Sequence, residues 1–229
     1  MMNKQRLTAL LTLVAVIAMT PSVELAGDEV RSVDFRQTWN GYMNVSNLPA
    51  DGGAFQFGSS WGTADLTAVF EGGQLVLGPN TIGDPDPYWY QGGGGPGAAG
   101  NKIMEANMYV EETDVFGAET LTFSGTFDSF TMTSAHEVRV FIKDFASDYS
   151  SFELSDQVID SAGDFSIDLA LNGGAGRHVQ YGFQTIGVNV WATDVAPFGT
   201  ANLAAIPEPS TMAVFGITGI ALTLRRRRK

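Results

Sequence analysis

The sequence predicts an all-β fold, an antiparallel β-sandwich of the jelly-roll type, with a short apolar helix at each end of the chain. Apolar and polar side chains alternate with a period of two in several stretches between residues 27 and 206. Gly-rich turns separate these stretches, and no segment there shows the 3.6-residue apolar period of a long amphipathic helix. Many short strands and few helices favour two packed sheets, with a barrel or an immunoglobulin-like sandwich as the alternative.

The individual strands follow from this alternation. The clearest case is Phe165, Ile167 and Leu169, which alternate with polar or small neighbours within residues 164–171. The same pattern predicts strands at residues 120–127, 137–143 and 179–183. Shorter candidates are residues 41–45, 54–58, 66–70, 74–77, 103–110, 152–154 and 188–191. Turn residues at 52–53, 72–73 and 172–174 separate neighbouring strands.

One long segment interrupts the strand pattern. Residues 84–100, DPDPYWYQGGGGPGAAG, predict a long, exposed and flexible loop with an aromatic cluster at its root. The alternative is that this loop divides the body into two halves, although neither half has enough strands to build a core. We therefore expect one sandwich domain over residues 27–203.

Composition and charge exclude several classes of protein. The 229 residues are 44% hydrophobic and 11% aromatic, enough to bury a core. The chain has no Cys and only two His, which excludes disulfides, Cys-based zinc sites, thiol nucleophiles and three-histidine metal sites. Residues 27–206 carry six basic and 23 acidic residues, a net charge of −17. Such a body is unsuited to nucleic acid, which requires clustered Lys and Arg.

The N-terminal segment predicts export. Lys4 and Arg6 precede an apolar run over residues 7–19, and Pro21 ends it. This layout is typical of a secretory signal peptide, which we assign to residues 1–26, with a signal helix and passage through the Sec machinery across the inner membrane. Cleavage after Ser22 and cleavage after Ala26 both remain open.

The C-terminal segment predicts a short transmembrane helix. Pro207, Glu208 and Pro209 precede an apolar run over residues 211–224. Its fourteen residues span only about 21 Å as a helix, against a hydrocarbon core of about 30 Å. The run is followed by Arg225, Arg226, Arg227, Arg228 and Lys229. These long cationic side chains can reach water from within the bilayer, and the positive-inside rule places them in the cytoplasm.

The order of these three parts resembles the PEP-CTERM sorting signal of Gram-negative, biofilm-forming bacteria, over residues 207–229. The resemblance implies that an exosortase, a membrane-embedded cysteine transpeptidase, recognises Pro207-Glu208-Pro209 and cleaves nearby. It also implies that the cluster Arg225, Arg226, Arg227 and Arg228 retains the chain at the membrane. The expected location is then the cell surface or extracellular space, after transient anchoring by the C-terminal helix. An ordinary C-terminal anchor would give nearly the same location.

Catalytic motifs are weak in this sequence. Residues 58–62, GSSWG, match the G-x-S-x-G pattern, but its strand-to-helix context is absent and we interpret Ser59 and Ser60 as turn residues. The acidic residues are numerous, yet sequence does not show which carboxylates stand at the ~5–9.5 Å spacing of a glycosidase pair. We therefore predict a protein that is not an enzyme, with a secreted glycoside hydrolase as the less favoured alternative.

Calcium is the only metal that the composition suits, because hard cations take carboxylate and carbonyl oxygens. Asp84 and Asp86, in a Pro-constrained loop, are the first candidates, and Asp144 and Asp148 are the second. Each of these acids is more simply explained as a solvated surface group. We predict no required cofactor beyond such a structural calcium ion.

The consecutive aromatics Tyr88, Trp89 and Tyr90 are the most suggestive cluster for binding. In a strand they could not all point one way, so either Trp89 or the pair Tyr88 and Tyr90 would face away from a core. Exposed rings can stack on the apolar faces of sugars, with Trp61 as a further member. The alternative is that these aromatics fill the sandwich core or cover its open end.

The body has a looser resemblance, in phrases such as WNGYMNVSNLP and HVQYGFQTIG, to β-sandwich passenger regions of PEP-CTERM proteins and of secreted proteins that act on polysaccharides. It implies a jelly roll associated with carbohydrate, without assigning a role to any residue. We predict a noncatalytic module that binds extracellular polysaccharide. Two other functions stay open: a purely structural envelope or biofilm component without a ligand, and a secreted hydrolase.

Overall fold

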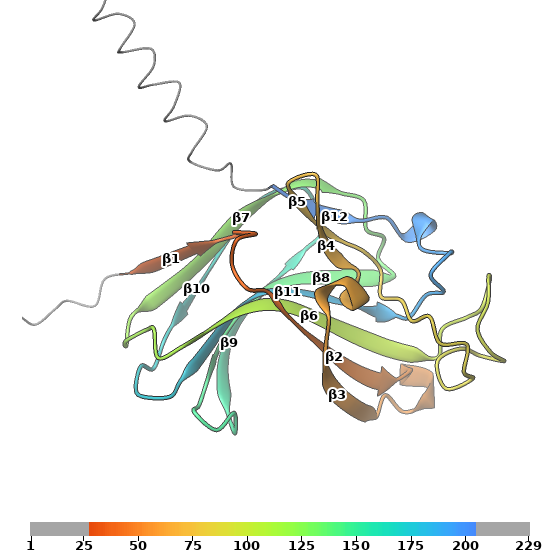
Figure 1. The fold of residues 1–229 in the computed structure, drawn as a ribbon, viewed down its shortest axis with the longest axis horizontal. Coiled ribbons are helices and arrows are strands. Elements are labelled where there is room, and N and C mark those ends of the chain that lie inside the picture. The colour runs from red at the N-terminus through yellow and green to blue at the C-terminus, as the bar shows by residue number, and fades with distance from the viewer. Residues whose placement is uncertain (1–27, 205–229) are drawn as a thin grey trace, which may run out of the picture.

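The computed structural model describes residues 28–204, which form two six-stranded sheets (Figure 1). The predicted signal peptide (1–26) and the PEP-CTERM segment (207–229), with the helix expected in each, lie outside the described residues. Within the described part, no helix is long and apolar enough to cross a membrane. Its helical turns are three short 3₁₀ segments, Pro49–Asp51, Thr63–Leu66 and Ala196–Phe198.

The first sheet, which we call the groove sheet, is antiparallel throughout. Its strand order is β3-β2-β6-β11-β8-β9. The strands are β3 (Phe55–Trp61), β2 (Asn40–Asn47), β6 (Lys102–Thr113), β11 (His178–Val188), β8 (His136–Phe145) and β9 (Phe152–Ile159). The long central strands β6 and β11 pair over eleven residues without a register shift, which keeps the side chains of each face in register.

The second sheet, which we call the terminal sheet, contains the first and last described strands. It consists of β10 (Gly163–Ala170), β7 (Thr120–Phe130), β12 (Ala201–Leu203), β5 (Gln74–Leu77), β4 (Ala68–Glu71) and β1 (Glu29–Ser32). β10 pairs along one edge of β7, while the parallel strand β1 and the antiparallel strand β12 share the other edge. β5 then pairs with β12, and β4 with β5.

The core between the sheets is rich in aromatic rings. Phe123 of β7 and Phe183 of β11 are both buried, and their ring centroids lie 5.6 Å apart. Phe165 of β10 also contacts Phe183, at 6.0 Å. Phe123 lies 5.2 Å from Tyr181, the next inward-facing residue of β11. These contacts join the two sheets and bury the apolar positions that the alternation predicted.

The structure confirms the all-β, two-sheet prediction and corrects several strands. Residues 188–191 are not a separate strand, because β11 runs to Val188 and Val190 forms only an isolated bridge with Thr81. Leu66 ends a 3₁₀ turn, so the strand predicted from that residue begins at Ala68. The short strands β1 and β12 carried too few alternating residues to be predicted. Ser59 and Ser60 lie within strand β3 and not in a turn.

Candidate functional site

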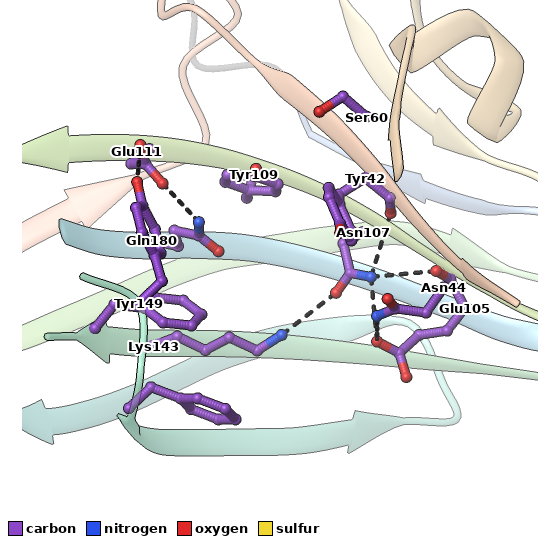
Figure 2. A pocket seen from close by; sticks show the side chains of 12 residues that line it. Tyr42, Asn44, Ser60, Glu105, Asn107, Tyr109, Glu111, Lys143, Tyr149 and Gln180 are labelled. Atoms are coloured by element: carbon purple, nitrogen blue, oxygen red, sulfur yellow. Dashed lines mark hydrogen bonds between the residues drawn. The ribbon is translucent and has the colours of Figure 1, made fainter. Parts of the chain in front are cut away.

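The outer face of the groove sheet is hollowed into a groove of about 580 Å³ (Figure 2). All six strands of the sheet, and the turn between β8 and β9, contribute to its lining. The lining residues are Tyr42, Asn44, Ser60, Glu105, Asn107, Tyr109, Glu111, Lys143, Phe145, Tyr149, Phe152 and Gln180. Polar and aromatic side chains thus share a surface that is assembled from segments far apart in the sequence.

The period of two explains why these side chains share one face. On β6, Met104, Ala106 and Met108 are buried toward the core, so the intervening side chains point outward. Strand pairing then sets the rows of the groove. Asn107 stands opposite Tyr42 on β2 and opposite Gln184 on β11. The alternation within each strand determines which face of the sheet a side chain lies on, and the register between strands determines which side chains lie beside it.

An amide network fixes one part of the groove. The Oε1 atom of Glu105 accepts hydrogen bonds from Asn44 Nδ2 at 2.9 Å, and from Asn107 Nδ2 and Gln184 Nε2 at 3.1 Å each. Gln184 Nε2 also donates to Asn107 Oδ1 at 2.7 Å. Because each side chain is held by at least one other, their polar atoms occupy defined positions before any ligand arrives.

A second network lies further along β6. Glu111 accepts hydrogen bonds from the Tyr149 hydroxyl at 3.0 Å and from Gln180 Nε2 at 2.6 Å. The Tyr149 ring stacks on His178, with centroids 4.2 Å apart and planes 13° apart. Desolvation, together with the Glu111 hydrogen bond, raises the pKa of Tyr149 to about 12. The hydroxyl therefore stays protonated and donates to the carboxylate at neutral pH.

Lys143 lies between these networks. Its Nζ atom is 4.4 Å from the ring centroid of Phe141 and 5.9 Å from that of Phe152. It donates a long hydrogen bond of 3.4 Å to Asn107 Oδ1. Burial lowers the pKa of its ammonium group, with attraction from Glu105 and Asp156 opposing the change. The described part of the chain offers this ammonium no ion pair within 4 Å.

Gly182 leaves the groove sheet without a side chain between two aromatic residues. Gly182 on β11 pairs with Tyr109 on one side and with Phe141 on the other. A Cβ atom at this position would lie 2.1 Å from the backbone oxygen of Met108. A larger residue would therefore force β6 and β11 apart, and glycine leaves the two rings flanking a position that has no side chain.

The aromatic cluster of residues 88–90 lies elsewhere, in the loop between β5 and β6, and the structure corrects its predicted orientation. Tyr90 is fully buried and donates from its hydroxyl to the carbonyl oxygens of Ile82 at 2.6 Å and Val190 at 3.1 Å. Trp89 is 9% exposed and only Tyr88, at 37%, faces solvent. The prediction that Trp89 or the pair Tyr88 and Tyr90 faces outward is wrong, because the segment is a turn and not a strand.

Trp61 is also separate from this cluster. It is half-buried on β3, packs against the core and donates from Nε1 to Ser59 Oγ at 2.8 Å. Among the described residues, no ring contact joins Trp61 to residues 88–90, whereas Trp89 contacts Phe57. The four aromatics predicted as one glycan site therefore do not form one surface. Ser60, the serine of the G-x-S-x-G match, lines the groove from strand β3, although the sequence predicted a turn there.

The acidic pairs predicted for calcium occupy different environments. Asp84 and Asp86 are exposed, and each accepts a backbone N–H two residues further on. Asp144 is buried, and its carboxylate accepts hydrogen bonds from Arg177 at 2.7 Å and from the backbone N–H of Asn172 at 2.8 Å. In residues 28–204 no three His, Asp or Glu side chains converge as a metal site. Calcium at Asp84 and Asp86 stays a prediction.

Sequence reasoning missed the groove itself. Its signal was present in residues 103–110, where Glu105, Asn107 and Tyr109 occupy the polar phase of a predicted strand. What was missing was the register that sets them beside Tyr42 and Gln184. A period-two pattern shows which residues leave the core, and it does not show which strands are neighbours.

Comparison with known proteins bears on the tail of the chain. A family model described as the PEP-CTERM protein-sorting motif matches residues 205–228. This match confirms the motif that residues 207–229 resemble, including Pro207, Glu208, Pro209 and the four arginines, all of which lie outside the described residues. No curated protein and no solved structure matched the chain.

Proposed function

We propose that this chain, an exported protein that carries a PEP-CTERM motif for processing by exosortase, binds extracellular polysaccharide noncatalytically in the groove of its sandwich. The observation that carries the proposal is the groove lining. Aromatic rings lie beside amide side chains whose polar atoms are already held in place. This location for the ligand replaces the loop cluster of residues 88–90, whose rings are mostly buried.

The lining suits a ligand that is both hydroxylated and apolar on its faces. A sugar ring offers C–H faces that can lie on Tyr42 or Tyr109, and hydroxyls that can pair with amide groups such as Asn44 and Gln180. Preorganised polar groups favour binding because less conformational entropy is lost on association. An open groove along a sheet also admits a polymer, whose chain continues beyond the site.

The spacing of the groove carboxylates supports a noncatalytic role. Glu105 and Glu111 are six residues apart on β6, which corresponds to about 20 Å at 3.3–3.4 Å per residue. Glycosidase pairs stand ~5–9.5 Å apart. These two acids are therefore too far apart to share one glycosidic bond, and each is already hydrogen-bonded to neighbouring side chains.

The position of the last strand supports access to the groove at a cell surface. β12 belongs to the terminal sheet (Figure 1), and the residues that line the groove belong to the other sheet and to the turn between β8 and β9. A chain anchored beyond β12, as the PEP-CTERM motif implies, would leave the sandwich from the layer that does not carry the groove. We expect transient anchoring at the inner membrane and a final location at the cell surface or in the extracellular matrix.

We also infer that the sandwich is a jelly roll. Its eight strands from β5 to β12 are divided between the sheets in the orders β5-β12-β7-β10 and β6-β11-β8-β9. The first strand of the eight pairs with the eighth and the second with the seventh, as in two successive Greek keys. Strands β4, β2 and β3 then extend the outer edges, and β1 fills the free part of one edge of β7.

A glycan array probed with the full-length chain tests the proposed function. We expect binding to at least one bacterial extracellular polysaccharide, and a loss of about tenfold or more in the variant Tyr109→Ala. Tyr88→Ala is the matched control, because Tyr88 is an exposed tyrosine outside the groove. Equal binding by both variants, or turnover of the polysaccharide, would contradict the proposal. Trp89→Ala is uninformative because Trp89 is buried.

A second candidate function is a structural envelope or biofilm component without a ligand. It is favoured by the edge strand β9, where Phe152, Leu154 and Val158 are 45–50% exposed. Exposed edge strands pair readily with other chains. Ordered assembly of the purified chain, together with an empty array that includes the producer's own polysaccharide, would establish this function instead.

A further inference from the structure

We propose that Lys143 makes the groove selective for acidic polysaccharide by binding a carboxylate of the saccharide. This inference rests on the proposed function, because it names the chemical class of the ligand that the groove takes. It assigns one residue of the lining a role in specificity, and it predicts a preference that can be measured separately from binding itself.

The charged groups on this face differ in whether they already have partners. Arg139 is paired with Glu137 and with Asp156. Glu105 accepts three amide hydrogen bonds, and Glu111 accepts one hydroxyl and one amide hydrogen bond. The anions of the groove are thus satisfied by donors of the chain.

Lys143 has no equivalent partner. It has three N–H donors, of which one makes a hydrogen bond of 3.4 Å to an uncharged amide oxygen. In residues 28–204 every arginine forms an ion pair, whereas neither Lys143 nor Lys102 does. The ammonium group of Lys143 therefore has no anionic partner among the described residues, whereas the carboxylates of Glu105 and Glu111 already accept hydrogen bonds from neighbouring side chains.

The surroundings of the ammonium group increase its need for an acceptor. The Nζ atom lies over the rings of Phe141 and Phe152, and burial of the group lowers its pKa. A carboxylate placed at Nζ would stabilise the charged form and supply a charge-assisted hydrogen bond. A neutral hydroxyl would supply a hydrogen bond without the charge, so it should bind less tightly.

Long-range electrostatics act against this attraction. The body carries a net charge of −17, and Glu105 and Glu111 line the same groove. The preference must therefore come from short-range contact with Lys143. Salt at physiological concentration screens the distant charges beyond about 8 Å and affects the buried contact less.

Titration calorimetry with paired probes tests the inference. The probes are uronate-containing oligosaccharides from bacterial extracellular polysaccharides, each measured beside its methyl ester, which keeps the ring and linkage and removes the charge. We expect the full-length chain to bind at least one acid about tenfold or more tighter than its ester. Lys143→Met should bring the two affinities within about threefold of one another, and Lys143→Arg should keep the preference.

Lys102→Met is the matched control. Lys102 also lies against an aromatic ring, 4.3 Å from that of Tyr88, and does not line the groove. This variant should retain the preference for the acid. If acid and ester bind the native chain equally and Tyr109→Ala weakens both, the role of Lys143 is refuted and the proposed function stands. If neither form of any probe binds, the role of Lys143 is refuted, and the glycan array decides the proposed function. If Lys143→Met fails to fold, the native chain still tests the inference, because its affinity for each acid can be compared with its affinity for the methyl ester.

Discussion

The aromatic residues 88–90 and the aromatic residues that line the groove differ in their exposure to solvent. Tyr88, Trp89 and Tyr90 are consecutive in the sequence, yet the fold buries two of them and leaves only Tyr88 at the surface. The groove aromatics come from β2, β6, β8, β9 and the turn after β8, and the fold brings them to one open face. Adjacency in sequence therefore did not create a binding surface, whereas strand pairing did.

The difference has a simple physical cause. The loop that carries residues 88–90 turns back through hydrogen bonds from the N–H groups of Trp89 and Tyr90 to the carbonyl of Asp86. This turn directs the rings of Trp89 and Tyr90 inward, where they belong to the core. On the central strands of the groove sheet the inward positions are already filled by Met, Val and Phe, so aromatic residues in the opposite phase must remain outside.

The largest effect should come from removing a buried ring. Tyr90→Ala deletes a fully buried side chain and leaves a cavity, which should lower the free energy of unfolding by about 3–5 kcal/mol. Urea unfolding followed by circular dichroism measures this loss. Tyr149→Ala removes the same residue type from the groove, where 47% of it is exposed, and should cost much less. Equal losses of unfolding free energy in Tyr90→Ala and Tyr149→Ala would contradict the distinction between the buried loop aromatics and the exposed groove aromatics.

The next effect concerns the centre of the groove. Gly182→Ala places a methyl group against the backbone of β6, which should destabilise the chain by about 1–3 kcal/mol. Gly83→Ala, near the loop cluster, is the matched control because nothing lies within 4 Å of its added Cβ atom. Thermal unfolding of both variants checks the pair. A neutral Gly182→Ala would show that the central strands tolerate separation there.

A third test uses pH to probe the buried end of the sandwich near the loop. His136 is 3% exposed, and burial lowers its pKa below the ordinary value of 6.5. The unfolded chain then binds a proton that the folded chain does not, so stability should fall as pH drops below about 6.5, by at most about 1.4 kcal/mol per pH unit. Unfolding measured between pH 7 and 5 tests this slope. His136→Phe should reduce the slope, and an unchanged slope would assign it to other groups.

The smallest effect should be seen at the groove edge. Tyr149→Phe removes one hydroxyl, which donates to Glu111 on a partly exposed surface. We expect a loss of stability below about 1 kcal/mol, because water can replace the hydrogen bond. Tyr90→Phe removes a hydroxyl that donates to two backbone carbonyls, one of them in a buried contact, and should cost more. Urea unfolding of the two variants measures the difference, and we expect the lower midpoint for Tyr90→Phe. A lower midpoint for Tyr149→Phe would contradict this expectation.

The sequence by itself determined the fold class, the approximate positions of most strands and the sorting motif at the C-terminal end. The alternation in residues 164–171 is a local property that follows from the pleat of a strand, and β10 occupies Gly163–Ala170. The PEP-CTERM motif is equally local, since its three parts are adjacent at residues 207–229. Local patterns of this kind are readable because each residue's role depends on its neighbours in the chain.

Only the tertiary structure decided the candidate site. Asn107 lies beside Tyr42 and Gln184 because β6 pairs with β2 and β11, although Tyr42 is 65 residues and Gln184 is 77 residues away in the chain. Strand pairing also leaves the Nζ atom of Lys143 over the rings of Phe141 and Phe152, without an ion pair in the described residues. Register between distant strands is set by the summed packing of the core and by the turns, and no single segment encodes it.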